Sequence, residues 1–261
     1  PVVLAVTQPS GMTRHRVWVS EKKHAFTFPA ADRPRMVRFD PGDWILKDLQ
    51  FERSREDLLY QLERDPDMMG RHEAAEALKP LAGDEAVEVA LLARLDAEPF
   101  WGVRLQILAS LSEGRGESLR KAFMARFAKE PKSRVRRQIV RALADMGGPE
   151  LRGFLREAVA KDPSYFVVAD ALKALGRVAK REAQPDALAA LNRESHDDVI
   201  REAAVDVLAQ DEAVSGEPPA EIVKRLADLF RPGSSPSLRG AVLRALGRAG
   251  KGHQSAFQLL T

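Results

Sequence analysis

The sequence predicts a mainly α-helical fold, in which an α-α superhelix is preceded by a short β-strand portion. Short runs of β-branched and aromatic residues occupy about the first fifty positions. From Arg53 onward the chain becomes rich in Ala, Leu, Arg and Glu with helical spacing. A unit of about 33 residues then recurs through this second part, and such a period is typical of stacked helix pairs.

Residues 1–52 have the pattern of β-strands joined by turns. The expected strands are Val2–Thr7, His15–Val19, Ala25–Phe28, Met36–Phe39 and Trp44–Lys47. The turn before the last of them is Asp40-Pro41-Gly42-Asp43. Because so few short strands make only a marginal sheet, we expect them to belong to a larger β-sandwich. The chain also starts at Pro1 rather than at Met, so we expect it to be a piece of a longer protein.

Residues 53–261 contain a helical repeat that is anchored on a proline or its substitute. The anchors are spaced by 33, 32, 32, 33 and 38 residues, at Pro66, Pro99, Pro131, Pro163, His196 and Ser234. Apolar residues four, eight and twelve positions after the anchor keep one helical stripe apolar. The spacing predicts about six helix pairs. We expect each anchor in the first turn of a second helix, with the preceding Asp or Glu at the N-cap.

An arginine recurs five residues after the anchor. It stands at Arg71, Arg104, Arg136, Arg201 and Arg239, while the fourth unit has Val168 instead. We expect these arginines to be structural, with hydrogen bonds to carboxylates or carbonyls of neighbouring repeats. One helix pair cannot bury its own apolar stripe, so the pairs must stack. This Pro, Val-Arg, Ala-Leu spacing resembles HEAT repeats, which implies a HEAT-like α-α superhelix (solenoid) over residues 53–261, preceded by a short β-sandwich portion over residues 1–52.

The composition excludes several classes of function. The 41 Lys and Arg against 38 Asp and Glu give a formal net charge of +3, which requires no anionic partner. The absence of cysteine excludes a disulfide framework, a thiolate nucleophile and a Cys-based zinc site. The first apolar run, Val2–Val6, is too short for a signal peptide, and no run approaches the about 20 residues of a membrane helix. We expect a soluble chain whose compartment is open, with the cytoplasm favoured.

No catalytic residue, metal ligand or cofactor is expected in these residues. The segment His72-Glu73-Ala74-Ala75-Glu76 approaches the zinc-protease pattern His-Glu-x-x-His, but the second histidine is absent. Its alanines also fall on the apolar stripe of a repeat helix. The remaining histidines are scattered, and the sequence has neither a Gly-x-Ser-x-Gly elbow nor a Gly-rich phosphate loop.

Charge is distributed unevenly along the repeats. Residues 115–141 hold ten basic and two acidic side chains, and residues 182–212 hold nine acidic and two basic ones. The candidates for binding a partner or a peptide are Arg134, Arg136, Arg137 and Arg141. Nucleic acid is the competing ligand of a basic stripe, but two Tyr and three Trp offer few surfaces for stacking bases. The favoured interpretation is therefore a solvated or intramolecular face.

The junction between the two parts has a more distinctive pattern. Met36-Val37-Arg38-Phe39-Asp40-Pro41-Gly42 leads through Trp44-Ile45-Leu46-Lys47 to Asp65-Pro66-Asp67 and Arg71-His72-Glu73-Ala74-Ala75. It resembles the junction between the β-sandwich and the C-terminal helical domain of bacterial aminopeptidase N-type zinc metallopeptidases. The resemblance implies a noncatalytic C-terminal fragment that packs against the upstream catalytic domain of the same polypeptide and walls the chamber for the peptide substrate.

The catalytic signatures of that family do not occur in this sequence. Zinc is therefore implied only for the catalytic domain of the parent enzyme, and no catalytic or metal residue is assigned here. The alternative is a stand-alone HEAT-repeat scaffold for protein-protein interaction, with DNA binding a weaker one. An upstream reading frame that carries a zinc motif would distinguish these hypotheses.

Overall fold

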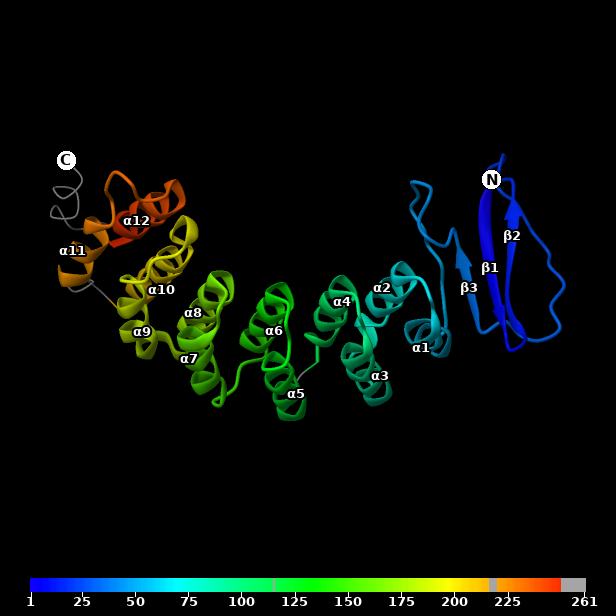
Figure 1. The fold of residues 1–261 in the computed structure, drawn as a ribbon, viewed down its shortest axis with the longest axis horizontal. Coiled ribbons are helices and arrows are strands. Elements are labelled where there is room, and N and C mark those ends of the chain that lie inside the picture. Colours follow the sequence, from blue (N-terminus) through cyan, green and yellow to red (C-terminus); the bar gives the residue numbers. More distant parts are fainter. Residues whose placement is uncertain (115, 216–219, 250–261) are drawn as a thin grey trace. The chain divides into compact units, whose positions relative to one another are not determined.

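The chain begins with a three-stranded antiparallel sheet. In the computed structural model, which describes residues 1–114, 116–215 and 220–249, strand β1 (Val2–Gln8) lies between β2 (Gly11–Val17) and β3 (Met36–Phe39) (Figure 1). The register places Val2 opposite Val17 and Thr7 opposite Met36. A two-residue turn joins β1 to β2, and Gly11 supplies the positive φ of 135° that follows it.

Two of the five expected strands are not strands, so the prediction was wrong there. Residues 25–28 form no ladder, and the ring of Phe28 stacks on His15 with 3.9 Å between centroids. Residues 44–47 follow the expected turn, but the Asp40 carboxylate accepts hydrogen bonds from Ile45 N and Lys47 Nζ. These local bonds hold the segment in place of a ladder with β3. Trp44 is consequently 83% exposed.

The helices of the described residues form six antiparallel pairs. The pairs are α1 (Arg55–Arg64) with α2 (Met68–Ala77), α3 (Glu85–Ala97) with α4 (Trp101–Leu111), α5 (Glu117–Phe127) with α6 (Ser133–Met146), α7 (Leu151–Lys161) with α8 (Tyr165–Ala179), α9 (Gln184–Ala190) with α10 (Val199–Ser215), and α11 (Ala220–Asp228) with α12 (Pro236–Ala249). Short 3-10 helices cover Lys79–Leu81, Lys180–Ala183 and His196–Asp198. The predicted fold class, a helical solenoid after a short β portion, is confirmed. The β-sandwich itself stays a prediction.

The chain divides into two compact units, residues 1–115 and 116–261, each with its own core. The first contains the sheet and α1–α4, so the change from strands to helices lies inside it. In the second unit α6 packs on α8, α8 on α10 and α10 on α12. Fully buried side chains such as Leu143, Leu155 and Leu172 fill that core. Among the described helices, none combines the length and apolar character that crossing a membrane would require.

The anchor proline lies before the second helix, which corrects its expected place in the first turn. Helices α4, α6 and α8 each begin two residues after their proline. The acid before the proline is not an N-cap either, since Glu98 and Asp162 are C-caps of the preceding helices in extended conformation. The residue before a proline avoids the helical region, so the chain must leave the first helix there. The Asp162 carboxylate then accepts a hydrogen bond from Ser164 N at 2.8 Å.

Candidate interaction surface

Arg136, one of the four predicted binding residues, belongs to the frame of the solenoid. Its Nε and Nη2 donate to the two carboxylate oxygens of Asp162 in the next repeat, at 2.7 and 2.9 Å. Its Nη1 donates to the carbonyl oxygens of Glu130 and Pro131 at 3.0 and 3.1 Å. The hydrogen bond with Asp162 raises the pKa of Arg136. Arg136 is therefore engaged within the solenoid.

Arg71 repeats this arrangement in the first unit. It donates to both carboxylate oxygens of Glu98 at 2.8 and 2.9 Å and to the carbonyl oxygens of Asp65 and Pro66, each at 3.0 Å. The expectation that repeat-position arginines bond carboxylates and carbonyls is thus confirmed for Arg71 and Arg136. Burial alone raises the pKa of Glu98, but hydrogen bonds from Arg71, Phe100 N and Arg94 outweigh burial and lower that pKa to about 2.

The fourth repeat joins the fifth without this ion pair. Val168 replaces the arginine and is buried, and Ser195 stands at the position of the acid. The Ser195 hydroxyl instead accepts a hydrogen bond from Ile200 N near the start of α10. Because donor and acceptor are replaced together, neither side leaves a buried charge without a partner.

The other three predicted arginines lie on a face of α6 different from that of Arg136. They are spaced by three and four residues, at Arg134, Arg137 and Arg141. Arg137 Nε donates to Asp170 of α8 at 2.6 Å, and Arg141 Nη2 lies 3.1 Å from the same carboxylate oxygen. The Arg137 guanidinium also lies 5.1 Å from the centre of the Phe166 ring. We call these five residues the α6–α8 face. Two guanidinium groups on it share one carboxylate.

The sequence analysis missed Phe166 and Asp170. Phe166 is 45% exposed at the start of α8, next to an exposed Tyr165, and neither aromatic is needed by the core. Two signals were present in the sequence. The aromatics directly precede the apolar stripe that begins at Val167, and Asp170 follows Arg137 by 33 residues, which is one repeat length.

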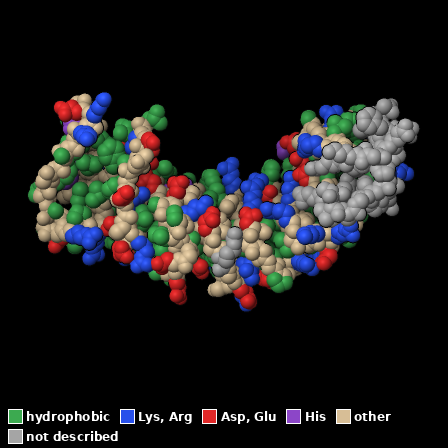
Figure 2. Space-filling model, turned by 180° about the vertical axis from the view of Figure 1, so that it is seen from behind, with side chains coloured by type: hydrophobic (Ala, Val, Ile, Leu, Met, Phe, Trp, Pro, Cys, Tyr) green, Lys and Arg blue, Asp and Glu red, His purple; other side chains and the backbone are tan. Residues whose placement is uncertain are grey.

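Opposite charges about one repeat apart pair along helices α6 to α10. Their distances lie between 2.7 and 3.0 Å, in the pairs Lys173–Asp206, Arg177–Asp145, Arg152–Glu182 and Arg156–Asp186. Figure 2 shows basic and acidic side chains intermixed over the helices. The basic and acidic stretches of the sequence are therefore partly matched with each other in space.

A buried ionic cluster connects β3 to the first helix pair. The Arg38 side chain is 3% exposed, forms an ion pair with Asp65, and lies 3.5 Å from Asp67 and 3.4 Å from Glu73. Burial raises the pKa of Glu73, although Arg38 opposes this rise. Glu73, a member of the incomplete zinc pattern, thus faces a guanidinium. Within the described residues no group of three or more His, Asp or Glu is arranged to hold a metal ion.

Comparison with known proteins relates the chain to helical-repeat structures. Residues 120–209 match the family described as HEAT repeats, and no curated protein matches the sequence. The fold is similar to the complex of CpcE and CpcF of phycocyanin lyase from Nostoc sp. PCC7120, with 18% identity, 83% of this chain and 84% of that chain covered, and a TM-score of 0.48.

The fold is also similar to aminopeptidase A of Legionella pneumophila, solved in complex with aspartic acid. That match has 15% identity and a TM-score of 0.52, and it covers 95% of this chain but 36% of the aminopeptidase. The chain therefore spans little more than a third of that protein, and the likeness is one of fold. What the chain shares with known proteins is a HEAT-repeat helical domain.

Proposed function

We propose that this chain is the noncatalytic C-terminal part of an aminopeptidase N-like zinc metallopeptidase, in which it packs against the catalytic domain and walls the peptide chamber. The observation that carries the proposal is the junction. The residues of the family-like pattern, Arg38, Asp65, Asp67 and Glu73, are those of the buried cluster that connects β3 to α1 and α2. The fold likeness to the Legionella aminopeptidase, which extends over 95% of this chain, also supports it.

The buried cluster suits a supporting role because it couples the sheet to the first helices. Breaking a buried ion pair is strongly destabilising, so the strand and the helix pair it joins resist separation. The sheet and the first helix pair can therefore act together as one supporting element. Zinc would be held by the upstream domain, and no residue described here is assigned to it.

The α6–α8 face is our candidate for holding the distal end of a peptide. Arg137 and Arg141 share Asp170, so a peptide carboxylate could bind Arg141, which is 49% exposed, while Arg137 keeps its internal partner. The exposed Phe166 ring offers an apolar surface beside it.

Two experiments test this function. The first is sequencing upstream of the codon for Pro1, where a continuous frame that encodes His-Glu-x-x-His supports the proposal and an in-frame stop codon contradicts it.

The second is fluorescence anisotropy with an N-terminally labelled nonapeptide that has either a free or an amidated C-terminus. We expect the free carboxylate to bind more tightly, and an Arg137→Glu/Arg141→Glu variant to lose about tenfold in affinity. Arg177→Glu, which alters an exposed arginine of α8 outside the face, is the control.

The second candidate function is a stand-alone HEAT-repeat scaffold that binds another protein. An apolar groove between two repeats, described below, favours it. An in-frame stop codon together with selective peptide binding at that groove would place this alternative first.

A further inference from the structure

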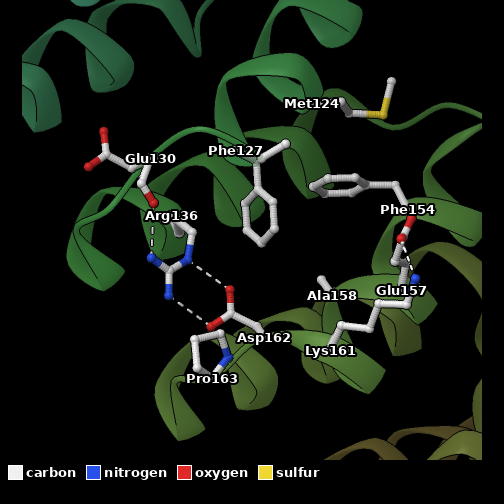
Figure 3. Close-up of a pocket in the computed structure, with 11 residues that line it drawn as sticks. Met124, Phe127, Glu130, Arg136, Phe154, Glu157, Ala158, Lys161, Asp162 and Pro163 are labelled. Carbon is white, nitrogen blue, oxygen red and sulfur yellow. Dashed lines mark hydrogen bonds and ion pairs between the residues drawn. The ribbon is translucent and has the colours of Figure 1, made fainter.

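A groove of about 450 Å³ opens between the C-terminal ends of α5 and α7 (Figure 3). Its walls carry Met124 and Phe127 from α5, Ala128 just after that helix, and Phe154 and Ala158 from α7. The rings of Phe127 and Phe154 meet edge to face with 5.0 Å between centroids. Figure 3 shows the Arg136–Asp162 ion pair closing one end. We call this feature the α5–α7 groove.

One wall of the groove departs from the repeat pattern. Phe154 stands nine residues before its anchor, where the neighbouring repeats have Ala90, Ala122 and Ala187. A phenyl ring presents far more apolar surface than a methyl group, so this position adds an aromatic wall that the neighbouring repeats lack. Phe127 is the counterpart of the buried Leu62 and Leu95, four residues before their anchors, yet it stays partly exposed.

The turn beside the groove carries positive charge. Lys129 and Lys132 are exposed and belong to the same turn as Ala128 and Glu130, which line the groove. Within residues 116–215, neither lysine ammonium group forms an ion pair. The charged residues of the lining itself are engaged: Lys161 bonds Glu157 at 2.8 Å, Arg136 bonds Asp162, and the Glu130 carboxylate accepts a hydrogen bond from Lys132 N at 2.8 Å. The two lysines therefore favour an acidic partner.

We infer that the α5–α7 groove docks an amphipathic helical segment of a partner protein. Large apolar side chains on one face of the segment would enter between Phe127 and Phe154, and acidic side chains beside them would meet Lys129 and Lys132. A groove between two helix ends suits a third helix, because apolar residues three or four positions apart project from one side of it. This inference does not depend on the aminopeptidase proposal.

Selection from a phage-displayed library of random 12-residue peptides on the full chain tests the inference. We expect enrichment of Leu, Ile, Phe or Met at spacings of three and four together with Asp or Glu. A synthetic copy of an enriched peptide should lose at least about tenfold in affinity for Phe154→Ala, since truncating a central aromatic residue removes most of its contact. Folding should survive this change, because alanine is the residue of the neighbouring repeats. On binding, the ¹³C-methyl NMR signal of Met124 should shift.

Two variants serve as references. Phe230→Ala removes an exposed phenylalanine at the same repeat position as Phe127 and should leave binding unchanged. The Lys129→Glu/Lys132→Glu variant should bind the acidic peptides more weakly. It should bind more tightly to copies of these peptides in which Lys replaces Asp and Glu. Absence of enrichment, enrichment of basic peptides, or affinity unchanged in Phe154→Ala would overturn the inference. A Met124 shift with decanoate and no enriched peptide would also overturn it, in favour of a small apolar acid.

Discussion

Gly70 shows how a single side chain can be excluded by its neighbours. A Cβ atom at this position of α2 would overlap both the Arg38 guanidinium and the Asp65 carboxylate. The Gly70 carbonyl oxygen also accepts a hydrogen bond from the buried Gln61 at 2.8 Å. The absence of a side chain therefore gives the ionic cluster the space it occupies.

Gly70→Ala is expected to lower the free energy of unfolding by more than about 2 kcal/mol, because the added methyl group must displace a buried ion pair. Urea denaturation followed by circular dichroism measures the change. Gly83→Ala is the control, since a Cβ atom there would meet nothing within 4 Å. Equal midpoints for the two variants would contradict the packing described around Arg38.

Glu98 makes stability depend on pH through its lowered pKa. Its folded-state pKa of about 2 lies below the ordinary 4.5, so its contribution is complete above about pH 4.5 and is lost as the pH falls from 4.5 toward 2. We expect Glu98→Gln to be less stable than the parent chain at pH 7 and to have a shallower pH slope in that window. Urea midpoints from pH 7 to pH 2 provide the measurement. Glu76→Gln, at an exposed position, should keep the parent slope.

Two adjacent arginines of helix α6 have different roles, one in the frame of the solenoid and one on the candidate binding face. Arg136 points toward the next repeat and Arg137 toward the α6–α8 face, while the buried Val140 and Leu143 face the core. The apolar stripe fixes the rotation of the helix, because only one orientation buries it. The helix therefore presents its binding candidates only as long as that stripe stays packed.

Leu143→Asp is expected to abolish cooperative unfolding of the second unit, because an unpaired buried carboxylate costs several kcal/mol. Leu243→Asp makes the same chemical change at a position of α12 that is 44% exposed, and it should cost far less. Differential scanning calorimetry distinguishes them. A sharp transition near the parent temperature for Leu143→Asp would show that the register of α6 is wrong.

The elements differed in how well the sequence predicted them. The helices were predictable because the offsets of four, eight and twelve residues repeat six times. The acids before the proline anchors were misassigned as N-caps, since Asp162, for example, ends the preceding helix and accepts the N–H of Ser164 from there. Trp44–Lys47 has a strand-like composition. Hydrogen bonds from Ile45 N and Lys47 Nζ to the Asp40 carboxylate hold this segment instead of a strand ladder, and composition alone does not predict such local bonds.

At the scale of the whole molecule, the candidate site depends on contacts one repeat apart. Arg137 and Asp170 are separated by 33 residues, so the basic segment looked less compensated in the sequence than it is in the fold. Phe127 and Phe154 belong to neighbouring repeats and lie 27 residues apart in the sequence, yet their rings meet in the fold. Predicting such pairs requires both the repeat length and the rotation of each helix about its axis. The sequence provided only the repeat length.

The pairing of opposite charges predicts weak nucleic-acid binding. We expect no submicromolar affinity for duplex or single-stranded DNA at physiological salt, since phosphates would compete with the Asp170 carboxylate that Arg137 and Arg141 share. Anisotropy titrations at low and physiological salt measure it. Tight binding at physiological salt that disappears in Arg134→Glu/Arg137→Glu would contradict this expectation.

The substitution of Val168 and Ser195 for the usual arginine and acid limits how the repeats can be rearranged. A repeat whose first helix ends in a carboxylate, as α7 does at Asp162, is a compatible successor only for a repeat that supplies a guanidinium, as at Arg136. The repeat that contains Val168 fits only a successor without such an acid. A chimaera that exchanged these repeats would bury a lone charge at a new boundary, so the helix pairs of this chain are not interchangeable parts but an ordered series.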